Sequence, residues 1–215
     1  MDAVIENLPR YLEGFAMTLQ LLLVSGVSAL VLGTLIAAMR ISPIASLRGF
    51  ATVYTELVRN TPLTLVIFFC AIVLPYLGSR LPYEIAAMIA LSIYTSPFVA
   101  EALRSGINGV PVGQAEAARS VGLGFGQTVG LIVLPQAFRM TIPPLINVFI
   151  ALTKNTSVAG GFFVVELFAV GRELANANGD AVIAILLGVA TLYLAITIPL
   201  GLIAGQLERK WVVQR

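Results

Sequence analysis

Residues 116–135 read EAARSVGLGFGQTVGLIVLP, and this stretch decides the topology of the chain. Residues 120–138 carry no charge and are about long enough to cross a bilayer, which takes about 20 apolar residues. They also contain Gly122, Gly124 and Gly126, and so many glycines would leave a lipid-exposed helix poorly held. The stretch therefore predicts a turn between two short helices outside the membrane.

The overall composition indicates an integral membrane protein. Hydrophobic residues make up 58% and charged residues 11% of the 215 residues, with a mean hydropathy of +0.94. A soluble globular domain carries about 25% charged residues, so this much apolar side chain would not fit inside one soluble core. The first apolar run already covers residues 14–39, and we interpret it as an anchor and not as a cleavable signal peptide.

The residue inventory excludes several kinds of site. The absence of histidine rules out a histidine-based acid, nucleophile relay or metal site. The single cysteine, Cys70, cannot form a disulfide within the chain and is interpreted as a packing residue. The sequence has no Gly-x4-Gly-Lys-[Ser/Thr] loop for binding ATP phosphates. We expect no enzyme activity, no metal, no cofactor and no nucleic-acid partner.

Charge asymmetry selects five membrane spans from six charge-free runs. Lys and Arg near span ends are retained in the cytoplasm. Five spans place the acidic N-terminus outside and the basic tail, with Arg209, Lys210 and Arg215, inside, whereas six would put both termini on one side. We expect one membrane domain, 1–215, with a cytoplasmic loop over about 105–139. The predicted spans are roughly 14–39, 55–78, 84–104, 140–165 and 181–207.

The predicted cytoplasmic loop has the pattern of a docking element. Pro111 suits the first turn of a helix, and Gly122 stands where that helix would end. Ala115, Ala118 and Gly122 fall on one side at spacings of three and four. A face of small residues flanked by charges suits a groove in another protein, because close approach is possible and the charges fix the orientation.

The spacing within the loop matches a known motif, EAA-x3-G-x9-I-x-LP, at every specified position. The matching residues are Glu116, Ala117, Ala118, Gly122, Ile132, Leu134 and Pro135. This is the EAA motif of ABC-importer permease subunits, which the chain therefore resembles. RNTPL at 59–63 and LTKNTS at 152–157 resemble the polar amino acid subfamily, and the chain is most similar in appearance to actinobacterial glutamate importer permeases.

The resemblance implies an all-α integral membrane protein with the type I ABC-importer permease fold: five transmembrane helices and a cytoplasmic coupling-helix loop. It implies three partners in a bacterial plasma membrane, which are a second permease subunit, homologous or identical, a cytoplasmic ATP-binding subunit dimer and an extracytoplasmic substrate-binding protein. Their expected cargo is polar amino acids, with glutamate favoured. The resemblance assigns the coupling to the ATPase to Glu116, Ala117, Ala118, Gly122, Leu134 and Pro135.

A charged residue inside a predicted span indicates a candidate substrate pathway. Lysine at a helix centre costs about 2.5–3.5 kcal/mol on insertion scales, so Lys154 requires a polar environment. Asn155, Thr156 and Ser157 follow it, and this polar stretch must face protein or water instead of lipid. The resemblance places such a stretch at the permease pathway, where Lys154 would meet a substrate carboxylate.

Two alternatives for Lys154 stay open at this point: it pairs with a carboxylate such as Glu101 or Glu166, or it extends to the membrane surface. Thr95 and Ser96, next to a proline, are expected to break the third span. They are weaker candidates for the same pathway, with helix packing as the alternative.

Residues 59–62 are expected to end an interfacial helix, with Asn60 or Thr61 capping the helix that follows. We interpret them as mainly structural.

A stand-alone secondary carrier or channel without an ATPase is the main functional alternative. Such a carrier would be expected to have inverted repeats with broken helices in matching positions, and the sequence shows no such symmetry. An enzyme acting within the membrane would have to work without histidine.

The five-span topology can be tested by cysteine labelling. With Cys70 replaced by Ala, a cysteine introduced at Gly122 or Gly124 should stay unlabelled when an impermeant thiol reagent is added to intact cells, because the loop is predicted to be cytoplasmic. Ready labelling from outside would contradict the topology.

Overall fold

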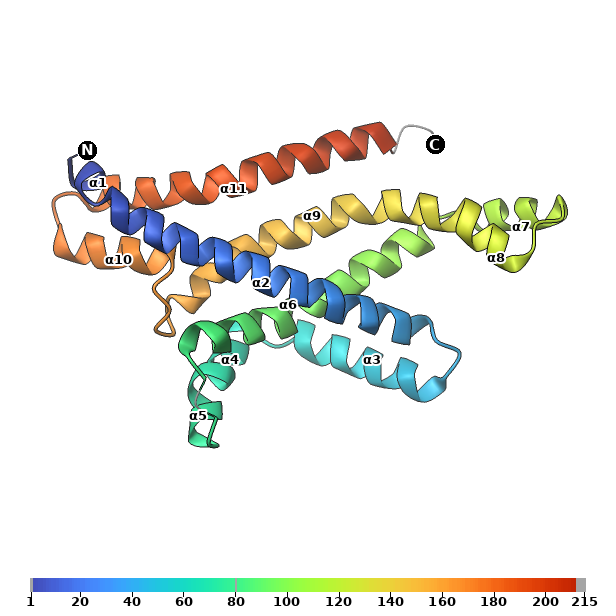
Figure 1. The fold of residues 1–215 in the computed structure, drawn as a ribbon, viewed down its shortest axis with the longest axis horizontal. Helices are drawn as coiled ribbons and strands as arrows, with labels where there is room; N and C mark the ends of the chain where they lie inside the picture. Colours follow the sequence, from blue (N-terminus) through green and yellow to red (C-terminus); the bar gives the residue numbers. More distant parts are fainter. Residues whose placement is uncertain (1, 80, 212–215) are drawn as a thin grey trace.

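The computed structural model describes residues 2–79 and 81–211, so Arg215 of the basic tail lies outside the described residues (Figure 1). Its regular structure is helical throughout that part of the chain. The elements are α1 (Asp2–Glu6), α2 (Leu8–Ile41), α3 (Ala45–Arg59), α4 (Leu63–Phe68), a π-helical segment (Phe69–Val73), α5 (Leu74–Tyr76), α6 (Tyr83–Asn108), α7 (Val112–Ser120), α8 (Phe125–Gln127), a second π-helical segment (Thr128–Val133), α9 (Leu134–Ala159), α10 (Leu167–Ala177) and α11 (Val182–Trp211).

Four helices of the described chain are long and apolar enough to cross a bilayer: α2, α6, α11 and the 35-residue helix Phe125–Ala159 that contains α8 and α9. A fifth span exists if α3 and Leu63–Tyr76 are counted together, although the chain bends by 101° between them. The all-α prediction is confirmed, and the count of five stays a prediction. Figure 1 shows the long helices running side by side, with α4 and α5 projecting to one side.

The predicted span 55–78 is not one straight helix, because the chain turns at Asn60, Thr61 and Pro62. The Asn60 side chain donates to the Glu56 carbonyl at 2.7 Å. The Thr61 hydroxyl donates to the Leu57 carbonyl at 2.8 Å. Both side chains therefore cap the end of α3, which corrects the expectation that one of them caps the following helix.

The third predicted span is a continuous helix, which corrects the expectation that Thr95, Ser96 and Pro97 break it. Pro97 lacks the N–H that would bond to the Ile93 carbonyl one turn earlier. That carbonyl accepts hydrogen bonds from the Tyr54 hydroxyl of α3 at 3.1 Å and from the Ser96 hydroxyl at 3.0 Å. Side chains thus satisfy the freed carbonyl, and the helix continues through the proline.

Helices extend into both ends of the range 105–139 that was predicted as a cytoplasmic loop. The helix α6 continues to Asn108, and a turn at 121–124 follows α7, with Gly122 in the left-handed region at φ 90°. The predicted second short helix is not separate, because α8 continues through the π-helical segment into α9. The predicted glycine turn is present, and the long helix Phe125–Ala159 begins directly after it.

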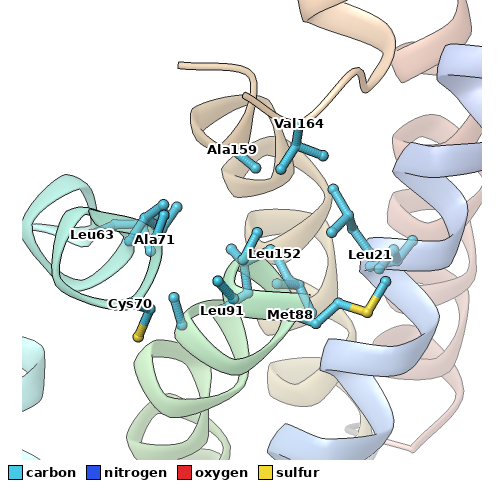
Figure 2. Packing of buried hydrophobic residues seen from close by; sticks show 14 residues of the cluster. Leu21, Leu63, Cys70, Ala71, Met88, Leu91, Leu152, Ala159 and Val164 are labelled. Atoms are coloured by element: carbon cyan, nitrogen blue, oxygen red, sulfur yellow. The ribbon is translucent and has the colours of Figure 1, made fainter. Parts of the chain in front are cut away.

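The main hydrophobic core lies where α2, α6 and α9 meet, with α4 and the first π-helical segment closing one side (Figure 2). Cys70 packs there as predicted, at 4% exposure. The approach of α2 to α6 requires a glycine, since a Cβ on Gly33 would lie 2.6 Å from Val99 and 2.7 Å from the Ser96 carbonyl oxygen. Small residues of this kind allow helices to pack closely in lipid.

The hydrogen bond from Tyr54 should stabilise the fold only because Pro97 frees a carbonyl. We expect Tyr54→Phe to lower the free energy of unfolding by about 0.5–1.5 kcal/mol. With Pro97→Ala, the Ile93 carbonyl regains a helical N–H, so the same change should cost less. Thermal unfolding in detergent of the four proteins of this cycle measures the difference. An equal cost in both backgrounds would contradict the assignment, and Tyr76→Phe, at an 88% exposed position, is the control.

Candidate functional site

A cavity of about 450 Å³ lies between α6 and α9. It brings together Thr95 and Asn155, which the sequence placed in the pathway on separate grounds. Most of the lining is apolar or aromatic, with a few polar groups, as is usual for small-molecule sites. The lining residues are Tyr94, Thr95 and Phe98 of α6, and Asn147, Val148, Ala151, Leu152 and Asn155 of α9.

The Thr95 hydroxyl in this cavity is buried without a hydrogen-bond partner. Thr95 is 3% exposed, and its Oγ1 contacts no donor or acceptor in residues 2–79 and 81–211. A buried polar group left unpaired costs about 1–3 kcal/mol, so this hydroxyl would be stabilised by a polar group that a bound molecule brought within reach. The carboxamides of Asn147 and Asn155 add further donors and acceptors in the same cavity.

Two other predicted pathway residues lie away from this cavity. Ser96 and Thr156 are both fully buried. The Ser96 hydroxyl lies 2.9 Å from the Tyr54 hydroxyl, in the contact that joins α3 to α6. The Thr156 hydroxyl donates to the Thr153 carbonyl within α9 at 2.7 Å. Neither side chain lines the cavity between α6 and α9.

Lys154 and Ser157 lie elsewhere on α9. They line a second cavity of about 310 Å³ between α9, α10 and α11, together with Phe168 and Tyr193. Lys154 is exposed, and in the described part of the chain its ammonium forms no ion pair. The structure therefore does not pair it with either of the carboxylates considered from the sequence.

Glu166 is fully buried and is engaged at the start of α10. Its carboxylate accepts hydrogen bonds from the backbone N–H groups of Phe168 at 2.9 Å and Ala169 at 2.7 Å. The Tyr193 hydroxyl of α11 donates to it at 2.7 Å. This capping role was missed from the sequence, where the signal was an acidic residue just before an amphipathic run.

Glu101 is surrounded by three arginines from three helices, a cluster that the sequence analysis missed. Arg40 of α2 donates to one carboxylate oxygen, and Arg104 of α6 donates to the other at 2.8 Å. Arg59 of α3 lies 3.8 Å from the first oxygen, and its guanidinium carbon is 5.7 Å from the ring centre of Phe98. The spacing of Glu101 and Arg104 by three residues was the visible signal.

The predicted coupling residues divide between two elements. Glu116, Ala117 and Ala118 lie on α7, where Glu116 is exposed and Ala118 is buried at 6%. Gly122 forms the turn, while Leu134 and Pro135 lie in the first turn of α9. Together with the turn, α7 and α8 form the tip of the molecule (Figure 1).

Large apolar side chains are exposed at this tip: Val112 at 73%, Val121 at 78% and Phe125 at 75%. The sequence analysis did not single these residues out, because it followed the small residues of α7.

The comparison with protein families shows which family the chain belongs to. Residues 29–213 match the family described as the binding-protein-dependent transport system inner membrane component, and this range includes the cavity and the tip. The chain belongs to this family. Two curated relatives match nearly the whole chain.

The glutamate transport system permease protein GluC of Corynebacterium efficiens is 41% identical over 219 residues, covering 96% of each chain. The probable glutamine ABC transporter permease protein GlnM of Bacillus subtilis is 39% identical over 210 residues, covering 98% of this chain and 97% of the relative. A crystal structure of an amino acid ABC transporter with histidines superposes with a TM-score of 0.89 at 28% identity, covering 96% of each chain. The predicted resemblance is confirmed.

Proposed function

We propose that the chain is the permease subunit of an ATP-driven importer of polar amino acids, with glutamate as the favoured substrate. It forms half of the translocation pathway and couples to a separate ATPase through the tip. The main support for this proposal is that one helix, Phe125–Ala159, begins at the glycine turn and also supplies one wall of the cavity. A helix of 35 residues is about 50 Å long, so it connects the two regions mechanically.

The cavity fits a small polar amino acid. Its volume of about 450 Å³ lies in the usual range for small-ligand sites. Asn147, Asn155 and Thr95 offer hydrogen bonds to the ammonium and carboxylate of an amino acid, and Lys154 lies on the same helix with its charge unpaired. The curated relatives named for glutamate and glutamine support this class of substrate.

The importer would contain a second permease subunit, a dimer of ATP-binding subunits and an extracytoplasmic substrate-binding protein. Family membership supports these partners. The exposed side of α9, with Asn147 and Lys154, is where a second permease would close the pathway. We propose that the tip is cytoplasmic and the N-terminus is outside, because Arg119 and Arg139 lie near the tip and basic residues are retained in the cytoplasm.

Reversing the charge of Glu116 tests the coupling to the ATPase. Glu116→Lys should abolish most of the stimulation of ATP hydrolysis by substrate in the reconstituted complex, because a like-charge contact at an interface can cost several kcal/mol. Insertion and thermal stability should be unchanged, since Glu116 is exposed.

Glu208→Lys is the matched control, an exposed charge reversal near the end of α11 that should leave stimulation intact. Wild-type stimulation in Glu116→Lys would contradict the coupling role. Failure of the wild-type permease to co-purify with an ATP-binding subunit would favour the stand-alone carrier instead.

Removing the charge of Lys154 tests its role in the pathway. If its ammonium binds a substrate carboxylate, Lys154→Met should lower uptake efficiency by roughly tenfold to a hundredfold, the effect of losing one charge-assisted hydrogen bond. Thermal stability should be unchanged, because no ion pair to Lys154 exists in the described chain. Lys210→Met, at an exposed position, is the control. Normal uptake would eliminate Lys154 as a required contact.

A further inference from the structure

The cluster around Glu101 holds more positive charge than the carboxylate can engage. Arg40 and Arg104 each donate to a different oxygen of Glu101, so both oxygens already have a charged donor. The third arginine, Arg59, is 3.8 Å from the nearer oxygen, beyond hydrogen-bond distance. The cluster of one carboxylate and three guanidinium groups therefore carries two unbalanced positive charges.

The guanidinium of Arg59 keeps its N–H donors available for an anion, because its contact with Glu101 is an ion pair at 3.8 Å and not a hydrogen bond. It makes no hydrogen bond to any acceptor in the described ranges, although it carries five N–H donors. Its side chain is 40% exposed, whereas that of Arg40 is 15% exposed. The ring of Phe98, 5.7 Å from the guanidinium carbon, orients the charge through a cation–π contact.

Phe98 also lines the cavity between α6 and α9, so Arg59 lies against a wall of that cavity. Thr95, with its unpaired hydroxyl, precedes Phe98 by three residues and lies about one helical turn away on the same face. Arg59 is not itself a lining residue, so it would reach a molecule bound to Thr95 and Asn155 by moving past the Phe98 ring. This site is distinct from Lys154, which lines a different cavity.

We infer that Arg59 binds the side-chain carboxylate of an acidic amino acid and so selects acidic over neutral polar substrates within the permease. The inference rests on the proposed function and adds a specificity residue to it. A cation that engages only the α-carboxylate, which every amino acid has, cannot separate glutamate from glutamine. The guanidinium of Arg59, a planar fork of donors, can distinguish glutamate from glutamine. A carboxylate accepts two parallel N–H hydrogen bonds, and a carboxamide does not.

The other two arginines are unsuited to this role. Arg40 is largely buried and donates to Glu101, and Arg104 is held by the second oxygen. Moving either of them would leave part of the Glu101 charge unpaired, and breaking such a pair is strongly destabilising. Arg59 can move towards a ligand without breaking a hydrogen bond.

The test is equilibrium binding of radiolabelled glutamate and glutamine to the purified complex of permease and ATP-binding subunits, without the substrate-binding protein. Arg59→Gln should weaken glutamate binding by roughly tenfold to a hundredfold and leave glutamine binding nearly unchanged. Arg59→Lys keeps the charge without the fork and should give an intermediate loss. Arg48→Gln is the matched control, because Arg48 is exposed and its guanidinium, among the described residues, donates to the carbonyls of Ser42 and Pro43.

The outcomes separate this inference from the proposed function. An equal loss for both amino acids, with a lower melting temperature, would assign Arg59 a structural role and overturn the inference. Unchanged binding of both would also overturn it. A wild-type complex that binds neither amino acid would overturn the proposed function, and the inference with it. Selective loss of glutamate binding with an unchanged melting temperature supports both.

Discussion

A backbone carbonyl inside a bilayer must accept a hydrogen bond from another group of the protein. In this structure one such hydrogen bond joins α3 to α6. Pro97 leaves the Ile93 carbonyl without its helical N–H, and the Tyr54 hydroxyl of α3 supplies a replacement. That contact fixes the end of α3 against the middle of α6. Arg59 follows Tyr54 by little more than one turn of α3, which places its guanidinium beside Phe98. A local defect in one helix thus positions a charged group on another.

The charges inside the bundle follow the same requirement for partners. Glu101 is held by Arg40 and Arg104, and Glu166 is held by backbone N–H groups and the Tyr193 hydroxyl. Buried charges that are paired in this way are tolerated, whereas isolated ones are costly. The polar groups left without partners are therefore informative. The Thr95 hydroxyl is one of them and lines the cavity, while Arg59 has a 3.8 Å ion pair to Glu101 and packs on Phe98, a residue of the cavity wall.

Continuous apolar runs predicted where long helices lie, because hydropathy and length together leave little choice in a membrane. The helix predicted over 140–165 instead runs over Phe125–Ala159. A helix end at residues 59–62 was predicted, but Asn60 and Thr61 cap the helix before them and not the one after, because such side chains can cap a helix on either side. The site was predicted in part for a geometric reason. Successive residues on a helix point about 100° apart, so the four polar residues 154–157 cannot all face one cavity. Asn155 and Thr95 line the same cavity because α6 and α9 cross there, and no sequence pattern specifies that crossing.

That crossing also constrains how the tip and the cavity can move. A Cβ on Gly106 of α6 would lie 1.8 Å from the Thr141 hydroxyl of α9, so the two helices are in direct contact there. Thr141 lies between the turn at 121–124 and the cavity residue Asn147 along one helix. Any rigid rotation of this helix about the contact moves its two ends in opposite directions. Pro143 and Pro144 lie just beyond this contact in α9, and prolines are sites where helices bend. A bend there would let one end of the helix move while the other end stays in place.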